Sequence, residues 1–170
     1  MWKQLYDWLI DADVITSANA TLLTMEFCNG SECLFKSADQ RENLRGFTVT
    51  KNGICVLDEA SFIPDEIFET IYPITNANKA PLFVISTPQF RTGEFYKLYE
   101  RGMNGVPGIT SFDWSTGYDM SEMISPEKLA YYRDTMTEMK FRSEILGEFL
   151  DDQSYVFGNF FKCGPGNDGR

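Results

Sequence analysis

Histidine is absent from the 170 residues of this sequence. Because histidine is the commonest general base in enzymes, Ser-His-Asp and Cys-His catalysis are excluded, and any catalysis must rely on carboxylates. The four cysteines form no CxxC pair and offer no zinc-ligand spacing. We therefore expect reduced thiols and no disulfide framework.

Long apolar runs and clustered positive charge are also missing. The longest apolar runs are far shorter than the roughly 20 residues that cross a bilayer, and the N-terminal residues lack the order of a signal peptide. We therefore expect an intracellular protein with no membrane partner. Lysine and arginine number 15 against 25 acids, for a net charge of -10, so the chain alone is not expected to hold a nucleic-acid backbone.

The hydrophobic content of 43% is sufficient for one globular domain with a sizeable core. Apolar residues at helical spacing from Trp2 to Leu9 predict a short helix that ends by Asp13. Alternating residues on either side of Asn29-Gly30 predict a hairpin. The polar stretch over residues 37–52 is typical of a surface loop.

Two uninterrupted apolar runs stand near the middle of the sequence, at residues 54–57 and 82–85. Such runs are typical of strands buried on both faces of a parallel sheet. Between them, Pro64 and a helical apolar pattern predict a helix that ends at Pro73. The order predicts a βαβ unit and an α/β fold.

The second half of the sequence has weaker patterns. We expect a helix from Gly93 to Arg101 and a strand near residues 109–114. A helical region is predicted to begin at Pro126 and to continue as far as Leu146. After Gly147 the sequence is typical of an extended linker.

Polar residues follow both predicted parallel strands, Asp58-Glu59 after the first and Ser86-Thr87-Pro88 after the second. Parallel strands place these groups at one edge of the sheet, where ligands bind in open α/β folds. Four apolar residues followed by two acids match the Walker B pattern, in which the aspartate helps to hold magnesium and the glutamate activates water. The alternative is that both acids only end a strand and cap the next turn.

A P-loop, the expected companion of a Walker B strand, is not found. The nearest string, GSECLFKS over residues 30–37, places Phe35 where the motif needs glycine. This segment has the pattern of a strand, so we do not expect it to cradle phosphates.

Four segments, in this order, resemble the ATPase domain of viral DNA-packaging terminase large subunits: NGSECLFKSADQRENLRG, ICVLDEASFIPDEIF, PLFVISTP and FYKLYERG. A later segment, FRSEILGEFLDDQSYVF, is similar to the part that leads from the family's ATPase domain to its nuclease domain. The span from Asn29 to Gly102 that holds the first four segments and this later segment together cover just over half of the chain.

The resemblance implies a partial P-loop NTPase fold of the ASCE type, with a mostly parallel sheet flanked by helices and with the first strand and P-loop missing. Residues 1–147 would be an incomplete ATPase domain, and residues 148–170 a linker toward an absent nuclease domain. Asp168 would be a nuclease acid or, as the alternative, a solvated terminal acid.

The resemblance also implies roles for individual residues. Asp58 would bind the magnesium of Mg-ATP, and Glu59 would be the catalytic carboxylate. Arg45 would act as an arginine finger on a neighbouring subunit's ATP, or else pair with a nearby acid. A motif that couples nucleotide state to DNA movement would comprise the three residues after the second strand, Ser86, Thr87 and Pro88.

The intact relative would hydrolyse ATP, with Mg²⁺, to move viral DNA into a capsid in the cytoplasm of an infected bacterial host. Its partners would be double-stranded viral DNA, the portal protein, the small terminase subunit and other copies of the large subunit in a ring. We expect this chain alone to be inactive. The alternatives are a non-enzymatic module that binds portal, small subunit or another motor subunit and, less favoured, a carboxylate-based nuclease.

Overall fold

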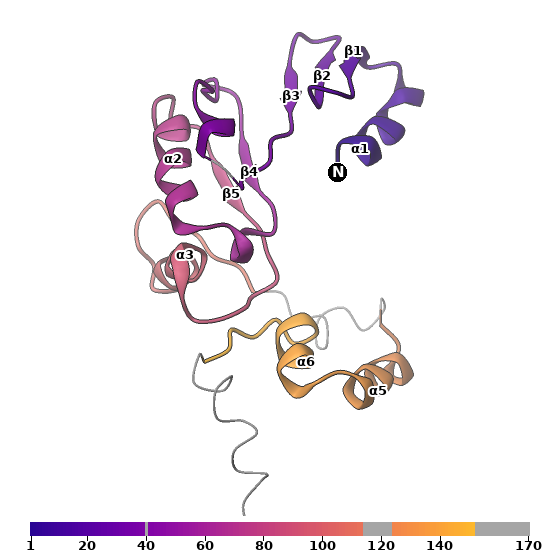
Figure 1. Ribbon diagram of the computed structural model, residues 1–170, viewed down its shortest axis with the longest axis vertical. Coiled ribbons are helices and arrows are strands. Elements are labelled where there is room, and N and C mark those ends of the chain that lie inside the picture. Colours follow the sequence, from indigo (N-terminus) through magenta and orange to yellow (C-terminus); the bar gives the residue numbers. More distant parts are fainter. Residues whose placement is uncertain (40, 114–123, 152–170) are drawn as a thin grey trace, which may run out of the picture. The chain divides into compact units, whose positions relative to one another are not determined.

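The computed structural model describes residues 1–39, 41–113 and 124–151 (Figure 1). The chain divides into two compact units, Met1–Phe47 and Thr48–Arg170. Within the described residues, none of the helices combines the length and apolarity that crossing a bilayer requires.

The first unit is a helix followed by a three-stranded antiparallel sheet. Helix α1 (Trp2–Leu9) continues as a 3-10 turn (Ile10–Ala12), and the strands β1 (Ile15–Asn19), β2 (Thr24–Phe27) and β3 (Glu32–Leu34) are adjacent in this order. The predicted helix and hairpin are confirmed. Gly30, at a φ of 78°, closes the β2–β3 turn by donating its N–H to the Phe27 carbonyl at 2.8 Å. Strand β1 was not predicted, because four of its five residues are exposed and its sequence therefore lacks an alternating apolar pattern.

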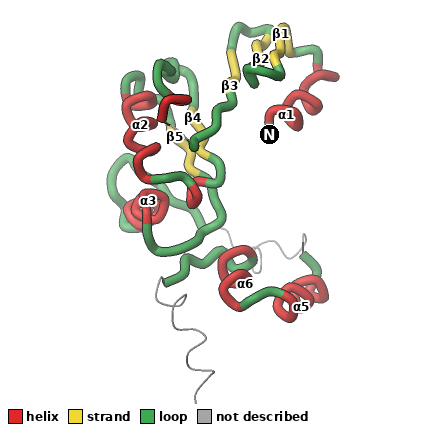
Figure 2. Tube along the Cα trace, in the orientation of Figure 1, coloured by secondary structure: helices red, strands yellow, loops and turns green. Residues whose placement is uncertain are grey.

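The second unit contains the predicted βαβ arrangement. Strands β4 (Cys55–Leu57) and β5 (Leu82–Val84) pair in parallel, with Val56 opposite Phe83. Between them the chain forms a 3-10 turn (Ala60–Phe62) and helix α2 (Asp65–Asn76), which lies beside the sheet in Figure 2. The fold is therefore mixed α/β with a small parallel sheet, whereas the larger sheet, in the first unit, is antiparallel.

The expectation that both parallel strands are buried on both faces is wrong. Leu57 is buried, but four apolar residues that alternate with the covered ones are half exposed or more: Ile54 at 61%, Val56 at 50%, Phe83 at 52% and Ile85 at 55%. The parallel register places all four on one face, which we call the bare face. The apolar runs arise because one side of the sheet packs on the core while the other carries apolar residues without cover.

Helix α2 extends past its predicted end. Pro73 lies inside the helix, which continues to Asn76. The buried hydroxyl of Thr75 donates to the carbonyls of Ile71 and Tyr72 at 3.2 and 3.1 Å. These bonds support the last turn, where the proline ring has no N–H to donate.

The remaining helices are α3 (Gly93–Met103), α5 (Pro126–Thr135) and α6 (Glu138–Glu144). The helical region predicted from Pro126 to Leu146 is broken at Met136, where the backbone is extended, and α6 restarts with Thr137 accepting the Lys140 amide in its N-cap. Residues 109–113 form no strand, contrary to expectation. The rest of that predicted strand lies outside the described residues.

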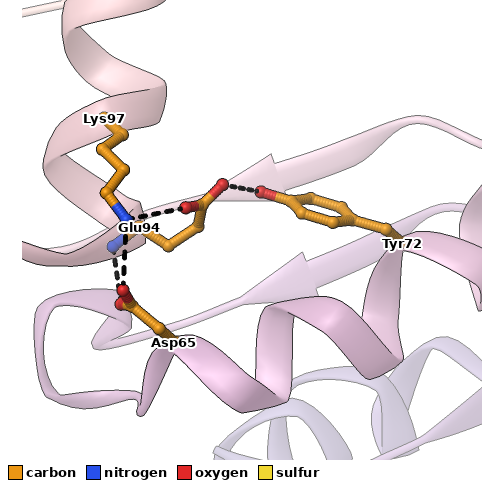
Figure 3. A network of polar contacts seen from close by, with 4 residues as sticks. All are labelled: Asp65, Tyr72, Glu94 and Lys97. Atoms are coloured by element: carbon orange, nitrogen blue, oxygen red, sulfur yellow. Dashed lines mark hydrogen bonds and ion pairs between the residues drawn. The ribbon is translucent and has the colours of Figure 1, made fainter.

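A polar network joins α2 to α3 (Figure 3). Asp65 Oδ1 accepts the backbone N–H of Glu94 at 2.7 Å, and Lys97 Nζ lies 3.3 Å from the other Asp65 oxygen. The Tyr72 hydroxyl donates to Glu94 Oε1 at 2.7 Å. Since α2 follows the loop after β4 and α3 follows the loop after β5, this network joins the two helices that come after the strand ends.

Candidate functional site

A cavity of about 300 Å³ lies at the carboxyl ends of β4 and β5. It gathers five of the site residues that the sequence indicated, the last residue of the second apolar run, and three residues from the α6 region. Its lining comprises Asp58, Glu59, Ile85, Ser86, Thr87, Pro88, Ser143, Glu144 and Gly147. The expectation that the two strand ends meet at one edge of the sheet is confirmed in geometry. The roles of these residues stay predictions.

Hydrogen bonds continue the pairing of the two segments beyond the strands themselves. Ile85 donates its N–H to the Leu57 carbonyl at 2.9 Å, and Ala60 donates to the Ile85 carbonyl at 3.1 Å. Ser86 Oγ then accepts the backbone N–H of Ser61 at 3.1 Å and lies 2.7 Å from its hydroxyl. The residues on either side of Asp58 and Glu59 are thus tied directly to the start of the Ser86-Thr87-Pro88 segment.

Glu59 adopts the left-handed backbone conformation, with φ 55° and ψ 39°. A residue with a side chain pays of order 1–2 kcal/mol for this conformation. Glu59 stands at the N-cap of the 3-10 turn, but its side chain makes no capping hydrogen bond. The capping alternative therefore does not apply to Glu59, whose exposed carboxylate stands at the cavity.

The charge of this cavity is strongly negative. Its lining holds three carboxylates and three hydroxyls, and it includes no lysine or arginine. Hard oxygen donors of this kind suit Mg²⁺, which usually takes one or two carboxylates and completes its shell with water and phosphate oxygens. Among the described residues no group of three or more His, Cys, Asp or Glu side chains is arranged to hold a metal by itself. The site therefore fits a magnesium ion that arrives with other ligands.

The residues of the α6 region that line the cavity, which we call the α6 wall, were not predicted from the sequence. Buried Ser143, on α6, donates its hydroxyl to the Pro88 carbonyl, and Gly147 follows α6 with a φ of 65°. The only sequence signal for this wall was the similarity of the FRSEILGEFL segment to the family. Spacing along the chain cannot bring α6 to the sheet edge, because more than fifty residues separate Pro88 from Ser143.

The other residues indicated by the sequence lie elsewhere. Arg45 belongs to the first unit, where it is exposed and follows a 3-10 turn (Arg41–Leu44). The segment 30–37 contains the hairpin turn and β3, which confirms its interpretation as a strand. Asp168 lies outside the described residues.

A larger cavity, of about 450 Å³, lies next to the first and shares Gly147 with it. Its charges are paired, with Arg142 Nε 2.7 Å from Glu148 and Arg91 Nε 3.5 Å from Asp151. Burial, together with the hydrogen bond from Tyr99 to Asp113 at 2.7 Å, raises the pKa of Tyr99 to about 12. None of the sequence-predicted site residues lines this cavity, so the smaller one remains the candidate site.

No protein-family model and no curated protein matches the sequence. Solved structures do share its fold, among them two of phage large terminases. The ATPase domain of the Thermus phage P74-26 large terminase, in an arginine mutant, is 20% identical, with a TM-score of 0.62 over 87% of this chain and 69% of that one. The large terminase of a thermophilic bacteriophage is 14% identical, with a TM-score of 0.67 over 87% of this chain and 36% of that one. The chain thus has the fold of phage large-terminase ATPase domains and spans about a third of the second protein.

Proposed function

We propose that this chain is part of the ATP-hydrolysing motor of a DNA-packaging terminase large subunit. The observation that carries the proposal is the single cavity lined by both strand-end motifs, Asp58-Glu59 and Ser86-Thr87-Pro88. In an α/β fold this edge is where nucleotides bind. The likeness of fold to two phage large terminases supports the same conclusion.

In this proposal Asp58 holds the magnesium ion of Mg-ATP, and Glu59 accepts a proton from the attacking water. Magnesium neutralises charge on the phosphates when it is bound. The two acids can divide these tasks because they are neighbours in sequence while the left-handed backbone at Glu59 turns the chain sharply between strand and 3-10 turn. Neither carboxylate is engaged by a hydrogen bond or ion pair within the described residues, so both remain available.

Ser86, Thr87 and Pro88 would couple nucleotide state to DNA movement. Their support is positional, since Ser86 contacts the segment after Glu59 and Pro88 contacts α6. Arg45, exposed in the first unit, would reach the ATP of a neighbouring copy, because a guanidinium stabilises charge on a transferring phosphoryl group. A homo-oligomeric ring, viral DNA, portal and the small subunit are the partners that this role requires.

The 170 residues hold only part of such a site. They contain no P-loop string, and the lining of the cavity offers no cation for the phosphates. The bare face supports the proposal that a further element, which would carry the phosphate-binding groups, packs on the parallel sheet. The proposed partial P-loop fold, the ATPase region over residues 1–147 and the linker over 148–170 follow from this interpretation. We expect no Mg²⁺-dependent ATP hydrolysis by the 170-residue chain.

The test uses Mn²⁺ as a paramagnetic substitute for Mg²⁺ in an NMR titration of the full chain. We expect selective broadening of the amide signals of Ala60 and Ser86, and its loss in Asp58→Asn. Asp134→Asn, which removes an exposed acid on α5, is the matched control and should leave the broadening intact. Uniform broadening that Asp58→Asn does not change would overturn the proposed metal site.

A non-enzymatic binding module is the second candidate, and the bare face favours it. In that case the chain would bind purified portal or small subunit equally well with and without nucleotide. Ile54→Thr and Val56→Thr would weaken the complex, while Asp58→Asn would not. Dependence of the complex on Mg-ATP would instead favour the motor.

A further inference from the structure

Phe149 packs against three aromatic rings of α3, which we call the α3 aromatic cluster. Its ring centroid is 5.7 Å from Phe95, 5.0 Å from Tyr96 in an edge-on arrangement, and 4.8 Å from Tyr99. Such pairs attract one another beyond the effect of burial alone. Three contacts from one ring therefore attach the segment after α6 to α3.

The same segment supplies backbone partners to the chain just after the Ser86-Thr87-Pro88 motif. Leu150, itself buried, donates its N–H to the Gln89 carbonyl at 2.8 Å, and its carbonyl accepts the Arg91 N–H at 2.9 Å. A parallel bridge pairs Phe90 with Leu150. Residues 88–91 are thus held by α6 and the residues after it, through Ser143 and Leu150.

The α3 aromatic cluster is held in place by contacts other than those with Phe149. Asp65 and Tyr72 of α2 hold the first turn of α3 through Glu94, as Figure 3 shows. Later in α3, the Tyr99 hydroxyl is bonded to Asp113. Helix α3 and its aromatic cluster are therefore held by α2 and by Asp113, independently of Phe149.

We infer that Phe149 is a positioning residue of the candidate site. It lies outside the lining of that cavity, but Gly147, two residues earlier, is part of it, as are Ser143 and Glu144. By anchoring the chain to α3, the ring holds the α6 wall opposite Asp58 and Glu59 and keeps residues 88–91 paired. The inference rests on the proposed function where it concerns bound metal, and on the observed contacts alone where it concerns the wall.

The experiment compares Phe149→Ala with Phe149→Tyr in the full chain. Phe112→Ala is the control, since it makes the same chemical change at a ring that is 85% exposed. Tyrosine keeps the ring and should rescue, because Phe149 is only partly buried and a hydroxyl can reach water. The first readout is hydrogen exchange at the Arg91 and Leu150 amides. We expect exchange about tenfold faster in Phe149→Ala than in Phe112→Ala or Phe149→Tyr, from the loss of the aromatic pairs.

The second readout is Mn²⁺ broadening at Gly147 relative to Ala60. A residue that only adds stability would not change this ratio in the folded fraction, whereas a positioning residue would. We expect Phe149→Ala to retain broadening at Ala60 and to lose most of it at Gly147. An unchanged ratio, with exchange at Arg91 and Leu150 equal to that of the control, would overturn the inference.

The results distinguish failure of the proposed metal site at Asp58 from failure of the proposed positioning role of Phe149. If Asp58→Asn leaves the broadening of the parent chain unchanged, the metal site is wrong. Exchange at Arg91 and Leu150 then decides alone whether Phe149 positions the wall. If Asp58→Asn abolishes the broadening and Phe149→Ala changes neither readout, the metal site stands and the positioning role falls.

Discussion

Asp65, at the first turn of α2, serves as the N-terminal cap of a different helix, since its Oδ1 accepts the backbone N–H of Glu94 in the first turn of α3 at 2.7 Å. The local N-cap residue of α3, Thr92, makes no side-chain capping bond. A tertiary contact therefore does the work that a neighbouring residue usually does.

Removing this cap should destabilise the second unit. We expect Asp65→Ala to cost about 1 kcal/mol, the usual value for loss of a capping side chain. Asp65→Asn keeps an oxygen acceptor and loses only the exposed ion pair with Lys97, which contributes little. Urea unfolding of both variants measures the difference, and equal losses would show that the charge and not the cap matters.

Glycine at position 59 should stabilise the protein while removing a proposed catalytic group. Glu59 has positive φ, which glycine adopts without strain, although glycine also gains freedom in the unfolded chain. We expect Glu59→Gly to gain up to about 1 kcal/mol in the free energy of unfolding, and Glu59→Ala to gain nothing, because alanine keeps the strain. Thermal and urea unfolding test the order. Glycine no more stable than alanine would contradict it.

The burial of Tyr99, together with its hydrogen bond to Asp113, should make stability sensitive to high pH. The folded pKa, raised to about 12 from an ordinary 10.0, favours folding fully below pH 10, and this contribution is lost as the pH rises from 10 through about 12. Tyr99→Phe should therefore lose less stability than the parent between about pH 10 and about pH 12. Tyr131→Phe, at an exposed tyrosine, is the control and should behave like the parent.

The two faces of the parallel sheet should respond differently to the same kind of change. Val56→Thr on the bare face should alter stability by less than about 0.5 kcal/mol, because the side chain is half exposed and threonine suits strands. Leu57→Ala on the covered face should cost about 2–5 kcal/mol through a cavity. Urea unfolding gives both values, and light scattering should show less self-association for Val56→Thr. A large loss in Val56→Thr would indicate that the face is covered in solution.

Local patterns carried most of what could be predicted. The hairpin followed from Gly30 and its alternating neighbours, and the βαβ unit followed from two apolar runs of strand length with a helix between them. Because parallel strands end at the same edge, Asp58 and Ser86 could be placed together without any knowledge of side-chain contacts.

What could not be predicted depends on contacts between distant residues. Ser143 reaches Pro88 only because α6 packs at the sheet edge. Phe149 contacts the aromatic rings of α3, which precede it by about fifty residues in the sequence. Composition also cannot distinguish a strand buried on both faces from one with a bare apolar face, since Val56 and Leu57 are both apolar although only Leu57 is buried. The predicted end of α2 at Pro73 was too early, because a proline usually ends a helix. In this helix the Thr75 hydroxyl donates to the Ile71 carbonyl and supports one further turn.

The paired hydroxyls of Ser61 and Ser86, 2.7 Å apart, allow either oxygen to be the donor. The Ser61 amide already donates to Ser86 Oγ, so each arrangement leaves a different hydroxyl proton uncommitted. Rotation about two C–O bonds converts one arrangement into the other without moving the backbone. The direction of the hydrogen bond between the two strand-end segments can thus reverse. Threonine at either position would keep this hydrogen bond, and alanine would remove it.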